Sequence, residues 1–192
     1  MRILVFVLGF SLSACSGGHS FLQGHKKASG GDAAAFDAAV AAGDAAWAGR
    51  VDQTKLAEAI KHWETAVGQK EDAATLTKIA RAHYFMGDAF LRFEGDGSGM
   101  FAAFKTGMKF AERALFFGSP AFQAKMKATS NNVADSIDVI GKDSMPAAYW
   151  YASNLGKWAK GKGFAVLLGN KGTIEAVMKR CEKIDPTGSF YH

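Results

Sequence analysis

The residue near the start of the chain with the most reactive side chain is Cys15, whose thiol can accept an acyl group. Arg2 supplies a positive charge ahead of it, residues 3–10 form an apolar run, and small residues follow up to the cysteine. This order of charged, apolar and small-residue segments is typical of a secretory signal peptide. The apolar run is too short to cross a bilayer, which needs about 20 residues. We therefore expect residues 1–14 to be a signal peptide that exports the protein.

The residues Leu12, Ser13, Ala14 and Cys15 resemble a bacterial lipobox. The resemblance implies that the Cys15 thiol is diacylated, that the leader is removed before it and that its new amino group is acylated. Two or three acyl chains, at about 0.8 kcal/mol per buried CH₂, would hold the protein on a membrane. Ser16, and not an Asp, follows the cysteine, and in the resembling lipoproteins this implies transfer to the periplasmic side of the outer membrane. The alternative is a secreted protein cut near Ala14, with Cys15 left as a free thiol.

Charge and cysteine content limit the partners and the cross-links of the exported chain. The formal net charge is +5, with 23 Lys and Arg against 18 Asp and Glu. Because the leader directs the chain out of the cytoplasm, this excess favours anionic membrane surfaces or acidic solutes, and we expect no nucleic-acid partner. If Cys15 is acylated, Cys181 is the only remaining thiol. An intramolecular disulfide is then impossible, and stability must come from a packed core.

Residues 15–32 are predicted to be a lipidated cysteine followed by a flexible linker. The linker is rich in glycine and serine and carries the pair Lys26 and Lys27. Such a composition is typical of a tether. It would hold the folded domain away from the lipid headgroups, while the two lysines can approach them.

Residues 33–192 are predicted to form one nearly all-α domain. No alternating β-pattern is sustained there, and the three prolines lie where helices can start or stop. The expected helix starts are Asp52, Asp72, Ser119 before Pro120, Ser144 before Pro146, and Thr173, and the expected ends are Gly68, Gly87 and Asp185.

Three of these helices carry the same spacing of residues, four and then three apart. The sets are Ala59, Trp63 and Ala66; Gly107, Ala111 and Ala114; and Ile174, Met178 and Cys181. Small residues let neighbouring helices approach closely, and a large residue between them fills the groove. The spacing resembles the second helix of a tetratricopeptide repeat. It predicts an array of antiparallel helix pairs, an α-solenoid.

A wider pattern runs from about Asp37 onward. Its segments are Gly43-Asp44-Ala45-Ala46-Trp47 with Arg50; Ala59-Ile60 and Trp63-Glu64 with Ala66; Ala80-Arg81-Ala82 with Tyr84-Phe85 and Gly87-Asp88; Gly107 with Ala111-Glu112-Arg113-Ala114-Leu115; residues 146–158; and Ile184-Asp185-Pro186 with Phe190-Tyr191. Together these segments resemble the T-component family of TRAP transporters.

The resemblance implies a periplasmic, tetratricopeptide-like lipoprotein that binds the solute-binding P-component of a TRAP system and is not an enzyme. Family members assemble as trimers with an apolar pore or cleft, which implies a homotrimer and a hydrophobic small molecule as ligand. The family continues with further helices beyond the position of His192, so we expect this chain to lack the C-terminal part. The alternative function is a general tetratricopeptide-like scaffold for envelope assembly, without a small ligand.

A candidate ligand pocket centres on the predicted helix around Trp150. Trp150, Asn154 and Trp158 are four residues apart and share one helix face. The tryptophans could simply be packed core, whereas a carboxamide among aromatic rings must find hydrogen-bond partners on a neighbouring segment or on a ligand. The functional hypothesis makes Tyr84, Tyr149, Trp150, Asn154 and Trp158 a mostly apolar pocket with a few polar contacts.

Other polar groups give little sign of chemistry. We expect Arg50 and Arg81 to pair with acidic residues at helix starts, with an anionic solute as the alternative. Gly161 and Lys162 match part of a phosphate loop, but Gly163 stands where a Ser or Thr belongs. No set of residues has the spacing of a metal site or of a catalytic motif. The sequence therefore predicts no catalytic residue, no metal and no cofactor.

Overall fold

The computed structural model describes Leu22 and residues 30–188, and every regular element within them is helical. The long helices are α1 (Ala33–Ala48), α2 (Gln53–Gln69), α3 (Ala73–Phe85), α4 (Gly97–Gly118), α7 (Met145–Lys162) and α8 (Phe164–Ile184). The shorter ones are η1 (Met86–Leu91), α5 (Pro120–Ala128), α6 (Val133–Ser136), η2 (Ile137–Val139) and η3 (Lys142–Ser144). The all-α fold class is confirmed. Cys15 and most of the predicted linker lie outside the described residues.

Side-chain caps fix where several helices begin. Asp52, Asp72 and Ser119 each accept a hydrogen bond from a backbone N–H in the first turn of the helix that follows, as the sequence predicts. The prediction that α7 begins after Ser144 is also confirmed, although the Ser144 side chain makes no capping bond. Pro146 lies in the first turn of α7, where a missing N–H is tolerated.

The predicted start of the last helix at Thr173 is wrong, because α8 begins at Phe164. Gly163 has a φ of 114°, a conformation that other residues rarely adopt, and this one residue reverses the chain between α7 and α8. Gly169 and Gly172 lie inside α8 with open space where a side chain would be. A helix accommodates such glycines at about 1 kcal/mol each, so they do not end it.

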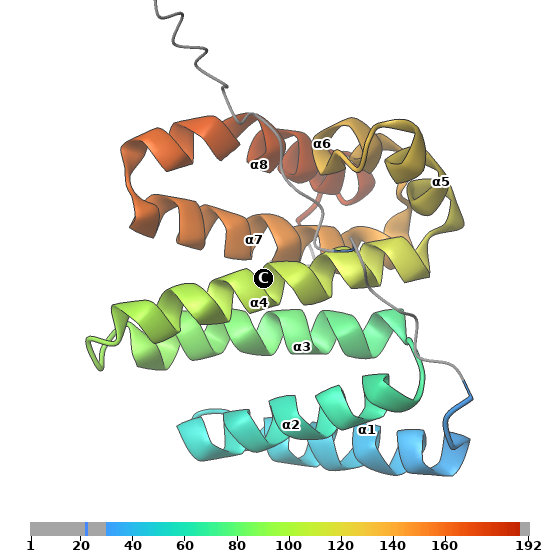
Figure 1. The fold of residues 1–192 in the computed structure, drawn as a ribbon, viewed down its shortest axis with the longest axis vertical. Coiled ribbons are helices and arrows are strands. Elements are labelled where there is room, and N and C mark those ends of the chain that lie inside the picture. Colours follow the sequence, from blue (N-terminus) through green and yellow to red (C-terminus); the bar gives the residue numbers. More distant parts are fainter. Residues whose placement is uncertain (1–21, 23–29, 189–192) are drawn as a thin grey trace, which may run out of the picture.

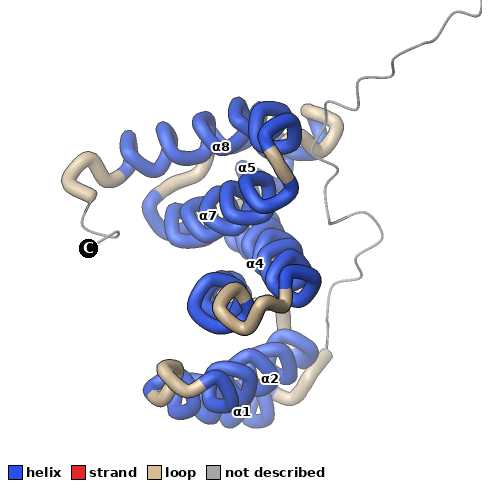
Figure 2. Tube along the Cα trace, turned by 90° about the vertical axis from the view of Figure 1, so that its left-hand side faces the viewer, coloured by secondary structure: helices blue, strands red, loops and turns tan. Residues whose placement is uncertain are grey.

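The long helices pack on their neighbours in chain order (Figure 1). α1 packs on α2, α3 on α4 and α7 on α8, and α4 and α3 both contact α7. Figure 2 shows α1 and α2 at one end of this stack and α8 at the other, with α4 and α7 between them. The small residues expected at helix contacts are buried: Ala59, Ala66, Gly107, Ala111 and Ala114. In this part of the chain, no helix is both long and apolar enough to cross a membrane.

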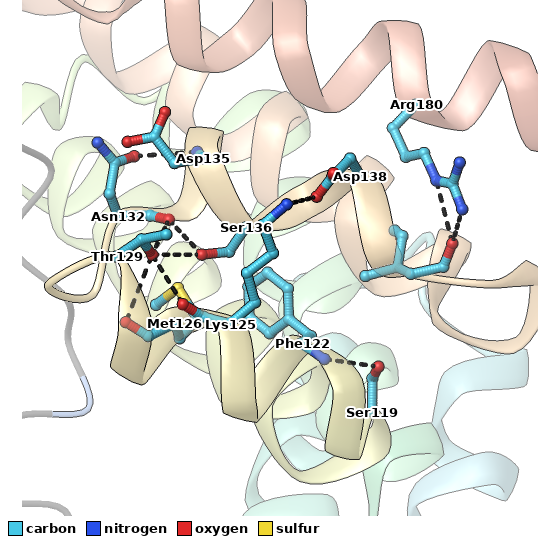
Figure 3. A network of polar contacts seen from close by, with 11 residues as sticks. Ser119, Phe122, Lys125, Met126, Thr129, Asn132, Asp135, Ser136, Asp138 and Arg180 are labelled. Carbon is cyan, nitrogen blue, oxygen red and sulfur yellow. Dashed lines mark hydrogen bonds and ion pairs between the residues drawn. The ribbon is translucent and has the colours of Figure 1, made fainter.

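Between α4 and α7 the chain forms a short-helix segment held by polar contacts (Figure 3). The hydroxyl oxygens of Thr129 and Ser136 lie 2.7 Å apart, and Ser136 Oγ also donates to the Asn132 carbonyl at 2.7 Å. Arg180 of α8 donates through Nε to the Ile140 carbonyl at 3.0 Å. These bonds satisfy backbone groups that the short helices leave open and fix the segment against α8.

Candidate functional site

Five partly buried aromatic side chains from α1, α3 and α7 lie together, and we call this group the aromatic surface. Its members are Trp47, Tyr84, Phe85, Tyr149 and Trp150. The ring centroids lie 5.6 Å apart for Trp47 and Phe85, 5.4 Å for Tyr84 and Trp150, and 5.0 Å for Tyr149 and Trp150. Such distances are favourable for aromatic pairs. The surface therefore joins the first helix of each of the three packed pairs.

Trp47 is held in place through α2. Its ring lies 5.6 Å from that of Trp63, which is only 1 % exposed and whose Nε1 donates to Asp44 Oδ1 at 3.1 Å. A Cβ at Gly43 would lie 2.4 Å from the Trp63 ring. The missing side chain at Gly43 is thus what lets α1 approach Trp63, and this contact fixes the end of α1 that carries Trp47.

Asn154 supports the aromatic surface from behind. It is completely buried, and its Nδ2 donates to the Trp150 carbonyl at 2.8 Å and to the Ala80 carbonyl of α3 at 3.2 Å. A Cβ at Gly107 would lie 2.4 Å from Asn154 Oδ1, so the glycine of α4 makes room for the carboxamide. Asn154 therefore fixes α7 against α3 beside two residues of the surface.

The structure places the five expected pocket residues in three settings. Tyr84, Tyr149 and Trp150 lie together in the aromatic surface. Asn154 lies beneath it with no exposed area, so the expectation that it meets a ligand directly is corrected to a supporting position. Trp158 lies two turns farther along α7 and packs partly buried against the core, without a ring contact to the others.

Tyr149 also borders an open depression beside α8. Its volume is about 440 Å³, and its other lining residues are Glu175, Met178, Lys179 and Glu182. Three of these four are charged, so the depression differs chemically from the aromatic surface. We assign it no role in the site.

Two arginines provide the charge of the site. The guanidinium carbon of Arg81 lies 4.9 Å from the ring centroid of Trp47, 5.6 Å from that of Phe85 and 5.7 Å from that of Trp150. The guanidinium carbon of Arg50 lies 5.0 Å from the centroid of the same Trp47 ring. Burial lowers the pKa of Arg81, and the positive charge of Arg50 lowers this pKa further.

The expectation that both arginines pair with acidic residues is wrong. Neither forms an ion pair with a residue of the described chain. Asp44 is already bound to Lys78 at 2.7 Å, and Asp88 accepts from Lys157 Nζ at 2.7 Å. The two guanidinium groups lie over aromatic faces instead, and Arg50 Nη1 also donates to the Trp47 carbonyl at 3.4 Å.

Lys157 links the other edge of the aromatic surface to η1. Its Nζ lies 5.6 Å from the Tyr84 ring centroid, and the hydrogen bond to Asp88 raises the pKa of Lys157. Burial, followed by the negative charge of Asp88, raises the pKa of Tyr84. Tyr84 therefore stays a neutral phenol at ordinary pH, able to exchange hydrogen bonds but not to act as a base.

The sequence reasoning did not assign Trp47, Phe85 or Arg81 to the site. The sequence does indicate that two of them lie together, because Arg81 and Phe85 are four residues apart on α3 and so share a helix face. The approach of Trp47 and Trp150 to the same guanidinium depends on how three helices pack, which local spacing does not reveal.

The arrangement can bind aromatic or apolar groups and attract anions. Among the residues that the structure describes, no group of three or more His, Cys, Asp and Glu side chains could hold a metal ion. No protein-family model matches the chain, and a search of curated proteins finds no significant relative.

Proposed function

We propose that this protein is a lipid-anchored accessory subunit of a TRAP-type transport system, located on the periplasmic side of the outer membrane. It docks the solute-binding P-component and binds a hydrophobic solute. The observation that carries the binding role is the aromatic surface, which places accessible faces of Trp47, Tyr84 and Trp150 next to one another. Aromatic side chains of this kind are enriched where proteins bind partners and small molecules.

The order of the helices supports a tetratricopeptide-like array. The pairs α1–α2, α3–α4 and α7–α8 follow one another along the stack, and the aromatic surface takes its residues from the first helix of each pair. In such arrays the surface shared by successive repeats is the usual binding face. The T-component family that this chain resembles forms homotrimers. A homotrimer of this chain would bring three aromatic surfaces into one assembly.

The lipid anchor is tested with a Cys15→Ser variant expressed in a diderm bacterium. The wild-type chain should incorporate an alkyne analogue of palmitate and sediment with outer membranes. The variant should incorporate none and leave the membrane fraction, because its hydroxyl cannot form the thioether to the lipid. A variant that is labelled and sediments like the wild type would show that Cys15 is not the anchor.

Docking is tested by cross-linked capture from envelope extract, using the anchored wild-type protein as bait and identifying the captured proteins by mass spectrometry. A TRAP solute receptor should be enriched with the wild type and lost with Trp150→Ala. The matched control is Phe164→Ala, because Phe164 is an aromatic residue of α8 that is 79 % exposed and lies outside the aromatic surface.

Two results would count against this function. A folded Trp150→Ala variant that captures the receptor as well as the wild type would remove the aromatic surface from docking. Capture of envelope-assembly proteins with no solute receptor would favour the alternative scaffold function. Thermal unfolding of each variant establishes that a loss of capture is not a loss of the fold.

A further inference from the structure

We propose that the edge of the helix stack formed by the α7–α8 turn and the η1–α4 turn lies against an anionic lipid bilayer. We call it the turn edge, and its residues are Phe93, Lys160, Lys162, Phe164 and Leu168. Its apolar side chains enter the interface between headgroups and acyl chains, and its lysines contact the lipid phosphates. This contact is distinct from the lipid anchor at Cys15 and does not involve the aromatic surface.

Exposed apolar side chains mark this edge. The turns that join α1 to α2, η1 to α4 and α7 to α8 all lie on the left-hand side of Figure 1. Phe164 is 79 % exposed beside the last of these turns, Phe93 is 72 % exposed in the second, and Val51 is 89 % exposed in the first. Leu168 is 58 % exposed and lies one helical turn after Phe164 on the same face of α8. Water therefore contacts several large apolar groups on one side of the molecule.

The charge around Phe164 is complementary to an anionic surface. Residues 144–174 contain four lysines and no acidic residue. Lys160 and Lys162 lie in the last turn of α7, and they form no ion pair with the residues that the structure describes. Lysines close to an anionic bilayer are attracted to it, and salt weakens this attraction. The α7–α8 turn is therefore the centre of the proposed contact.

The η1–α4 turn lies close to the α7–α8 turn. A Cβ at Gly161 would lie 2.4 Å from the Phe101 ring, so the end of α7 contacts the first turns of α4. Phe93 therefore extends the apolar part of the edge. Because Glu94 and Asp96 follow it in the same turn, this turn contributes an apolar contact and no net attraction between charges.

The shape of the turn edge favours a bilayer over a protein partner. Protein interfaces are built around a contiguous packed core. Side chains that protrude one by one from helix turns do not form such a core, but each can enter the fluid interface of a bilayer. Phenylalanine and leucine beside lysines are typical of surfaces that lie in this interface.

The test places a fluorophore beside Phe164 in the full-length Cys15→Ser variant. Ala165→Cys supplies an exposed thiol, and the other cysteine, Cys181, is completely buried, so an NBD label attaches at position 165. Vesicles contain phosphatidylcholine alone or with about one-third phosphatidylglycerol. With the anionic vesicles, the NBD emission should shift to the blue and be quenched by a nitroxide-labelled lipid. The neutral vesicles should produce a far smaller change, and added salt should weaken the response to the anionic ones.

The matched control is the same label at Val139→Cys. Val139 is 37 % exposed, but it is next to Ile140, whose carbonyl accepts a hydrogen bond from Arg180 near the opposite end of α8. Its emission should stay unchanged with both vesicles. Attachment of another segment to the lipid brings both labelled variants to the vesicle, so a response at position 165 alone locates the contact.

Substitutions separate the contribution of charge from that of the apolar side chains. Lys160→Gln combined with Lys162→Gln should weaken binding to the anionic vesicles by about fivefold for each lysine. The control pair is Lys127→Gln with Lys142→Gln, which removes two exposed lysines from α5 and η3, near the start of α7, and should have a smaller effect. Phe164→Ala should weaken binding by about tenfold, because less apolar surface leaves water.

Each result decides for or against the proposal. A label at position 165 that responds to neither vesicle, or to both equally, would overturn it, and so would an affinity that Phe164→Ala leaves unchanged. Equal losses from the two lysine pairs would mean that net charge alone attracts the protein. If substitutions at the turn edge leave vesicle binding intact but abolish capture of an envelope protein, the edge binds a protein and not lipid. The two vesicles are compared on an unaltered turn edge, so the inference is tested even if a variant does not fold.

Receptor docking can fail or succeed independently of this contact. Receptor capture from solubilised envelope requires no bilayer. Phe164→Ala should therefore keep receptor capture and lose vesicle binding, whereas Trp150→Ala should lose receptor capture and keep vesicle binding.

Discussion

Replacing Gly107 by alanine should destabilise the protein, although the same change in a helix is ordinarily stabilising. A Cβ at position 107 would lie 2.4 Å from Asn154 Oδ1 and 2.6 Å from Asn154 Cγ, far inside van der Waals contact. Asn154 is completely buried, so its carboxamide cannot simply turn into solvent. The substitution must therefore shift α4 from α7 or break the hydrogen bonds of Asn154.

The magnitude follows from opposing contributions. Overpacking of a tight contact costs about 1–3 kcal/mol, and each lost hydrogen bond of Asn154 costs about 1 kcal/mol more. Alanine regains about 1 kcal/mol of helix propensity. We expect Gly107→Ala to lower the free energy of unfolding by about 2 kcal/mol, which corresponds to about 4–8 °C in melting temperature for a domain of this size.

The assay is urea and thermal unfolding followed by circular dichroism at the helix band. The matched control is Gly172→Ala in α8, where no atom lies within 4 Å of the added Cβ. This variant should be more stable than the wild type by about 1 kcal/mol. In the double variant with Asn154→Ala, the clash disappears, so the two changes should cost less together than the sum of their separate costs.

Two observations would refute this reasoning about the contact between α4 and α7. The first is a Gly107→Ala variant that is stabilised to the same extent as Gly172→Ala. The second is strict additivity between the changes at positions 107 and 154, because independent effects would mean that the two side chains do not compete for space.

Three further predictions concern single groups. Cys181 is 0 % exposed, so in the Cys15→Ser variant, where it is the only thiol, it should react with a chromogenic thiol reagent only after unfolding in urea; fast reaction of this native variant would contradict its burial. Burial, followed by the charge of Glu112, raises the pKa of Tyr151 above its unfolded value, so the stability that its neutral phenol contributes should be lost as pH rises above about 10. Tyr151→Phe should reduce this alkaline loss in urea titrations, and an unchanged pH slope would contradict the assignment. Backbone N–H groups of Lys55 and Thr54 lower the pKa of Asp52, so its contribution is present above about pH 4 and lost as pH falls through the lowered pKa. Asp52→Asn should flatten the acid limb of the same titration, and a limb that stays as steep as in the wild type would argue against the cap.

Local chemistry made several helix boundaries predictable from the sequence. A cap such as Asp52 or Ser119 bonds to N–H groups two or three residues ahead, so the signal lies within a few positions. The end predicted near Gly87 fits less well, because the chain continues as a π-helical turn to Leu91. A Cβ at Gly87 would lie 2.8 Å from the Phe104 ring, so this glycine serves a contact with α4 rather than a helix end.

The site was less predictable because its members come from separate helices. The spacing of Trp150, Asn154 and Trp158 placed them on one face of α7, but it could not show that α3 covers Asn154. Likewise, Arg81 has no acidic neighbour along α3 that would reveal its setting. Only the packing of α1, α3 and α7 places this cation among three rings.

Asn154 links the stability of the fold to the geometry of the aromatic surface. Its Nδ2 bonds to the carbonyl of Trp150 and to that of Ala80, the residue before Arg81. The rotation of α7 against α3, and with it the distance between the Trp150 ring and the Arg81 guanidinium, therefore depends on this buried carboxamide. Because Gly107 leaves room for the carboxamide, an added methyl there should weaken capture of the solute receptor even in fully folded protein. A loss of stability without a loss of receptor capture would mean that Asn154 only holds the helices together and does not set the geometry of the aromatic surface.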